Sequence, residues 1–125
     1  MTELSKLSLA IGFCKEILGW RKSEPAGFPC EELMYTPKDQ DTQFFRFSNL
    51  DAVLRSARDW CHVMRSHPQV RGRSFGLALR YGTHGRIYTA EVRGGKIRGI
   101  WSSVDPCCAV MGACIQARLK IGVAA

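Results

Sequence analysis

The sequence lacks the patterns typical of a membrane protein, a zinc site or a nucleotide-hydrolysing enzyme. No apolar run approaches the length of about 20 residues that crosses a bilayer, and the N-terminal stretch with Lys6, Lys15 and Glu16 at helical spacing does not resemble an export signal. There is no Cys-x-x-Cys pair and no Walker or Rossmann glycine pattern. We therefore expect one cytoplasmic domain, 1–125, with no membrane segment, metal or cofactor.

Six cysteines are present, but their positions do not favour a disulfide scaffold. Cys14, Cys61 and Cys114 lie within helical patterns beside apolar residues, where a free cysteine behaves as a small apolar side chain. Metal binding is the alternative, yet Cys61 and His62 have no second ligand pair at zinc-finger spacing. We expect buried thiols.

Acidic residues are scarce in one part of the chain. Residues 65–98 hold eight Lys and Arg against the single acid Glu91, so this quarter carries the whole net charge of +7. Seven of the eight cations are arginines, whose planar guanidinium suits bidentate contact with phosphate. The charge distribution favours an anionic partner.

Hydrophobic periodicity predicts three helices and five strands. An apolar stripe from Leu4 to Leu18 indicates the first helix, and a second begins after Ser48 or Asn49. Asp105 and Pro106 are typical of the N-cap and first turn of the last helix. The predicted strands are Glu32–Thr36, Gln43–Phe47, Ser74–Tyr81, Arg86–Arg93 and Lys96–Trp101.

This order, α-ββ-α-βββ-α, predicts an α+β fold. Short glycine-bearing connections join the last three strands, which indicates an antiparallel meander. One narrow sheet face does not bury three amphipathic helices, so we expect a mostly antiparallel sheet with helices packed on both faces.

The meander contains the candidate binding residues. Side-chain alternation gathers Arg80, Arg93 or Arg98 beside small residues, while nearby aromatic rings offer surfaces for stacking a base. The loop after the second helix adds arginines that can close on a phosphate. Equally, the cations can form a solvated face and the aromatics part of the core. The candidate ligand-binding residues are Arg71, Arg73, Arg80, Tyr81, Tyr88, Arg93, Arg98 and Trp101.

Catalytic patterns are weak by comparison. Glu91 has no second carboxylate in the charged stretch, and His62, His67 and His84 have no evident Ser or Cys partner in the sequence. We expect a binding protein and not an enzyme.

Several residues resemble a known family. The first helix ends in Leu18-Gly19-Trp20, the meander ends in Trp101, and the closing segment reads Val104-Asp105-Pro106 with Ala109, Ala113 and Ala117. Together with the element order, this is similar to small phage-encoded "ABA sandwich" domain proteins. Proteins of this type include sponges that oppose Thoeris and CBASS immunity by capturing cyclic nucleotide signals. The resemblance implies sequestration in the host cytoplasm.

The leading hypothesis is a phage-derived accessory or counter-defence protein that sequesters a small anionic, nucleotide-type ligand, as a homo-oligomer. One alternative is a protein inhibitor, similar to an anti-CRISPR, whose basic face blocks a host defence protein. Another is a nucleic-acid-binding protein, for which affinity falls steeply with salt.

Overall fold

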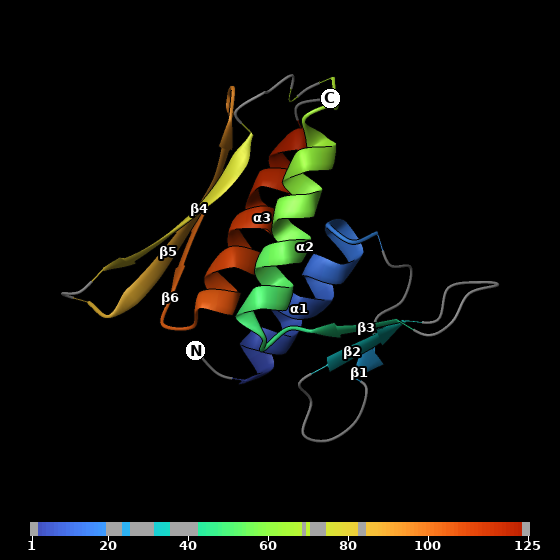
Figure 1. Cartoon of the computed structure of the whole chain (residues 1–125), viewed down its shortest axis with the longest axis vertical. Helices are drawn as coiled ribbons and strands as arrows, with labels where there is room; N and C mark the ends of the chain where they lie inside the picture. The colour runs from blue at the N-terminus through green and yellow to red at the C-terminus, as the bar shows by residue number, and fades with distance from the viewer. Residues whose placement is uncertain are drawn as a thin grey trace.

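The structure, a computed structural model, describes residues 3–19, 24–25, 32–35, 43–68, 70, 75–82 and 85–123. Helices alternate with groups of antiparallel strands along the chain (Figure 1). In chain order the elements are α1 (Glu3–Glu16), β1 (Glu24–Pro25), β2 (Glu32–Tyr35), β3 (Gln43–Arg46), α2 (Leu50–Met64), β4 (Gly76–Gly82), β5 (Ile87–Gly94), β6 (Ile97–Ser103) and α3 (Pro106–Val123).

The described strands form two separate three-stranded sheets, β1-β2-β3 and β4-β5-β6. In the second sheet, Tyr81 pairs with Tyr88 and Arg93 pairs with Arg98. Successive side chains of a strand point to opposite faces. The inner face packs mainly through β5 and β6 against α3. It carries Leu77, Leu79, Tyr81, Tyr88, Ala90, Val92, Ile97, Gly99, Trp101 and Ser103.

Two glycines allow α3 to lie close to β6. A side-chain carbon at Gly99 would collide with the backbone of Ala113 and Ala117, and one at Gly112 would collide with the indole ring of Trp101. α1 and α2 cover much of the α3 surface that the sheet leaves free. Because α3 is surrounded in this way, its sequence is apolar around most of its circumference and not along a single stripe.

α2 is amphipathic and starts with a side-chain cap. Asn49 Oδ1 accepts a hydrogen bond from the Ala52 backbone N–H at 3.1 Å, and Asp51 lies where the helix dipole favours negative charge. Trp60 contacts the ring of Phe75, the residue before β4, edge to face with centroids 5.6 Å apart. The buried residues of α2 are Val53, Ala57, Trp60 and Cys61.

α1 contacts both β3 and the start of α3. Its Phe13 stacks on Phe45 of β3 with ring centroids 5.2 Å apart. Its Lys6 Nζ bonds to Asp105 Oδ2 at 2.6 Å, while Asp105 Oδ1 accepts the Cys107 backbone N–H at 2.8 Å. Burial alone would raise the pKa of Asp105, but the Lys6 bond and charge and the backbone donors outweigh it and lower that pKa. Asp105 is therefore the N-cap of α3, as the sequence predicts.

The predicted α+β class is confirmed, as is the order of elements apart from the two-residue strand β1. The layering differs from the expectation of one sheet covered on both faces. The helices lie between the two sheets (Figure 1), and no described helix packs on the outer face of β4–β6. The reason is chemical: apart from Ile87 and Ile100, the large side chains of that face are charged or carry a hydroxyl group, and such a surface does not match an apolar helix stripe.

The prediction of buried thiols is confirmed for the five described cysteines, which are buried and are not in disulfide bonds. Cys30 lies outside the described residues. Among the described helices, none is long and apolar enough to cross a membrane.

Candidate anion-binding face

The side of β4–β6 that points away from α3 is exposed, and we call it the outer face. The strand register brings three arginines onto it, because Arg93 lies directly opposite Arg98, and Arg80 lies on the same side of β4. All three are exposed. The outer face consists of Gly76, Ala78, Arg80, Gly82, Ile87, Thr89, Glu91, Arg93, Arg98, Ile100 and Ser102.

Glu91 lies near the centre of these arginines. Its Oε2 accepts a hydrogen bond from Arg98 Nε at 2.5 Å, and its Oε1 lies 3.7 Å from Arg80 Nη2. The Arg98 bond, followed by the charges of Arg98, Arg93 and Arg80, lowers the pKa of Glu91 against a smaller opposing effect of burial. Glu91 is therefore ionised at neutral pH and neutralises part of the positive charge around it.

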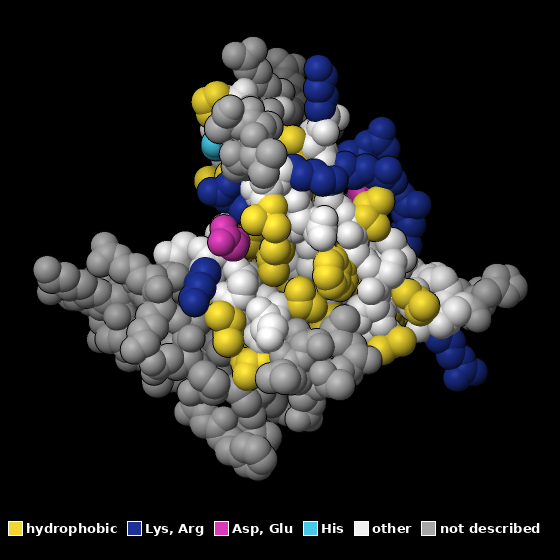
Figure 2. Space-filling model, turned by 180° about the vertical axis from the view of Figure 1, so that it is seen from behind, with side chains coloured by type: hydrophobic (Ala, Val, Ile, Leu, Met, Phe, Trp, Pro, Cys, Tyr) yellow, Lys and Arg dark blue, Asp and Glu magenta, His cyan; other side chains and the backbone are white. Residues whose placement is uncertain are grey.

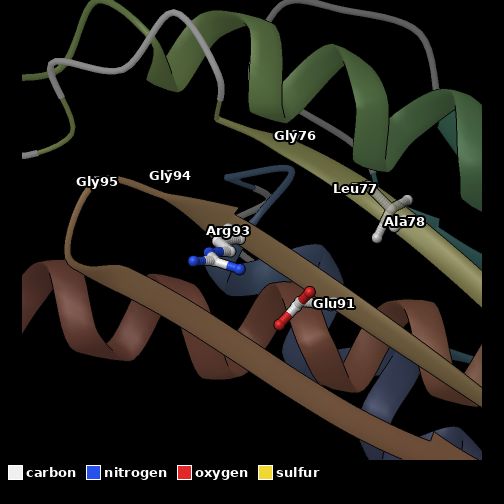
Figure 3. A pocket seen from close by; sticks show the side chains of 7 residues that line it. All are labelled: Gly76, Leu77, Ala78, Glu91, Arg93, Gly94 and Gly95. Atoms are coloured by element: carbon white, nitrogen blue, oxygen red, sulfur yellow. The ribbon is translucent and has the colours of Figure 1, made fainter.

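Arg93 differs from its two neighbours, since it forms no ion pair or hydrogen bond through its side chain with any described residue. It borders an open hollow of about 520 Å³, next to Glu91. Figure 3 shows the Arg93 and Glu91 side chains on the same side of β5, with the glycine-lined turn beside Arg93. The other described lining residues are Gly76, Leu77, Ala78, Gly94 and Gly95.

Two glycines follow Arg93 beside this hollow. A side-chain carbon on Gly94 would lie 2.5 Å from a ring carbon of Phe75, so this position admits no larger residue without rearrangement. Gly95 has φ of 59°, which places it in the left-handed region that glycine adopts most easily. Neither glycine places a side chain beside Arg93, and the hollow that Arg93 borders is open.

The predicted aromatic residues do not share this face. Tyr81, Tyr88 and Trp101 belong to the inner face, where the two tyrosine rings contact each other with centroids 4.7 Å apart. Trp101 packs over Gly112 of α3. The structure thus brings Arg80, Arg93 and Arg98 together and places the three aromatic residues on the opposite side of the sheet. Arg71 and Arg73 lie outside the described residues.

Positive charge also extends beyond the three arginines. Figure 2, which views the molecule from behind, shows Lys and Arg side chains gathered towards the side where β4–β6 lie. Lys96 is exposed in the β5–β6 turn, and Arg86 is exposed just before β5 with φ of 50°. Lys120 of α3 donates to the Arg98 backbone carbonyl at 2.5 Å. The outer face therefore has further cations at its margins.

Sequence reasoning missed the importance of Glu91 and of the glycines around the turn. Alternation places Glu91 and Arg93, two residues apart, on the same face, but it does not show that Glu91 pairs with Arg98. Alternation could also have shown that Gly99 faces α3 and not the arginines. The hollow itself had no comparable signal, because its lining comes from both β4 and β5.

Other chemistry is sparse among the described residues. No group of three or more His, Cys, Asp or Glu is placed to hold a metal ion within the described part of the chain. Burial raises the pKa of Cys61 and of Cys107 to about 11, with nearby Asp105 adding to the shift at Cys107. These thiols are therefore protonated at neutral pH and are poor nucleophiles.

Comparison with known proteins identified no relative of this chain. No protein-family model, curated protein or solved structure matches this chain. The case for function consequently depends on the geometry of the outer face.

Proposed function

We propose that this chain binds and sequesters a phosphate-bearing, nucleotide-type anion on its outer face, without catalysing a reaction. The observation that carries the proposal is Arg93, an exposed guanidinium with no described partner at the edge of an open hollow. Arg80 and Arg98 lie on the same face and add to the positive potential. A guanidinium donates two parallel hydrogen bonds to one phosphate, which gives both affinity and orientation.

Phosphate contact carries most of the recognition in this proposal. The rings of Tyr81, Tyr88 and Trp101 cannot stack on a base held at Arg93 of the same chain, because they lie across the sheet. A counter-defence role in the cytoplasm of an infected cell, performed by a homo-oligomer, is part of the same proposal. That part is supported by the resemblance to phage-encoded proteins and by the small size of the chain, and not by the geometry of the site.

Thermal-shift and calorimetric titrations test the proposal. The probes are inorganic phosphate, AMP, cyclic dinucleotides and cyclic ADP-ribose. A ligand present at 100 times its dissociation constant stabilises the fold by about 2.7 kcal/mol, which raises the melting temperature measurably. Arg93→Gln removes the charged donor, and we expect binding to weaken by about 10-fold to 100-fold, the loss typical of a charge-assisted hydrogen bond.

Arg58→Gln is the matched control, because it removes one exposed arginine from α2 and leaves the outer face unchanged. This variant should bind as tightly as the parent chain. The proposal is wrong if no probe shifts the melting temperature, or if the two variants weaken binding equally.

One observation favours a second function. Ile100 and Ile87 are 40% and 39% exposed on the outer face, among the cations. Apolar side chains beside arginines are typical of the centre of a protein–protein interface. We propose as the alternative an inhibitor that covers an acidic surface of a host protein. In that case Ile100→Ser should weaken capture of the target, whereas nucleotide titrations should show no binding to the parent chain.

A further inference from the structure

We infer that Glu91 is a specificity-determining residue that restricts the outer face to compact ligands with one phosphate group at a time and disfavours polymeric nucleic acid. The inference rests on the proposed function, because it concerns the same face and names the class of anion that the face accepts. The three arginines of this face have unequal surroundings.

Two of the three arginines are already engaged by one carboxylate. Arg98 Nε bonds to Glu91 Oε2, and Arg80 Nη2 approaches Glu91 Oε1 at 3.7 Å. The Glu91 side chain is only 13% exposed, so the outer-face side chains hold it in place between the two arginines. Glu91 therefore acts as a built-in counter-ion for Arg80 and Arg98.

Arg93 is within reach of the Glu91 charge, but it is the one of the three arginines whose guanidinium makes no hydrogen bond or ion pair with Glu91 or with another described residue, so its donors are open to an incoming phosphate. It borders the hollow in which Glu91 is the only acid among the described lining residues (Figure 3). A single phosphate can contact Arg93 from the glycine side and keep its distance from Glu91. A nucleic-acid strand cannot do so, because its phosphates follow one another along the backbone, and the strand would have to cross the Glu91 carboxylate to reach Arg80.

Charge removal at Glu91 should therefore change which anions bind. In Glu91→Gln, Arg80 and Arg98 lose their counter-ion and become available to a polyanion. Each additional phosphate contact on single-stranded nucleic acid steepens the salt dependence of log affinity by about 0.7. With two arginines released, we expect the slope to steepen by about 1.4 and affinity at 50 mM salt to rise on the order of 50-fold.

The experiment measures fluorescence anisotropy of a labelled 12-nucleotide single-stranded DNA between 50 and 300 mM sodium chloride. Asp59→Asn is the matched control, because it also removes one negative charge but lies exposed on α2, away from the outer face. Glu91→Gln should gain affinity and slope, and Asp59→Asn should change both only slightly. Adding Arg98→Gln to Glu91→Gln should reverse about half of the change in slope.

The inference fails if Glu91→Gln and Asp59→Asn behave alike, or if the parent chain already binds the DNA with the slope of the Glu91 variant. Thermal unfolding of each variant confirms that it is folded, and Glu91→Thr replaces Glu91→Gln if the latter is not. Titration of the parent chain with AMP and cyclic dinucleotides forms a separate arm. Absence of binding there overturns the proposed function, whereas the DNA arm tests the role of Glu91.

Discussion

Replacing Gly99 by alanine tests the close approach of β6 to α3. The added carbon would meet the backbone oxygen of Ala113 and would lie 2.5 Å from the backbone nitrogen of Ala117. These atoms belong to the helix backbone, so no side-chain rotation relieves the clash and β6 must move away from α3. Overpacking of a core typically lowers the free energy of unfolding by 1–3 kcal/mol. Because the clash here is with backbone atoms, we expect a loss of about 3 kcal/mol for this variant.

Urea unfolding followed by circular dichroism measures this loss. A domain of this kind has a total stability of about 5–15 kcal/mol, so the variant should still fold. With an m value of about 2 kcal/mol/M, a loss of about 3 kcal/mol lowers the urea midpoint by about 1.5 M. Gly82→Ala is the control, because the added carbon at this exposed strand position would meet only the Ile87 carbonyl, at an ordinary 3.5 Å. Equal midpoints for the two variants would refute the close packing of β6 on α3.

Two further predictions concern the helix cap and the thiols. Asp105→Ala removes both the cap of α3 and the partner of Lys6, and we expect a loss of about 1–2 kcal/mol at pH 7. Because the folded-state pKa of Asp105 is lowered, the part due to its charge is present above pH 4 and is lost as pH falls through that pKa. Denaturation curves between pH 3 and 7 measure both effects, and a pH-independent difference would contradict the Lys6 pairing. For the thiols, five of the six cysteines are buried, so a thiol reagent at pH 8 should label no more than Cys30 in the folded chain and all six after denaturation. Rapid labelling of two or more folded-state thiols would contradict the structure.

The sequence was sufficient to predict the helices and the second group of strands. The caps at Asn49 and Asp105 and the glycine turn between β5 and β6 are local signals, and the structure has all three. Alternation also predicted correctly that Arg80, Arg93 and Arg98 share one face. These features follow from residues that are close together in the chain.

The layering could not be predicted in the same way. It depends on which face of β4–β6 receives α3, and this is decided by contacts between elements, such as Gly99 of β6 with Ala113 of α3. The separation of Trp101 from the arginines could have been predicted. Arg98 and Trp101 are three residues apart on one strand, so their side chains point to opposite faces. The partnership of Arg98 with Glu91 required the register between β5 and β6, which sequence periodicity does not supply.

The position of α3 has a consequence for how the chain acquires its structure during synthesis. This helix follows in the chain every strand and helix that it touches. While a ribosome is still making it, the inner face of the meander and the apolar sides of α1 and α2 have no common surface to pack against. The nascent chain must keep these apolar surfaces from associating with other molecules until Pro106–Val123 has emerged, so this core should not form before α3 has been made.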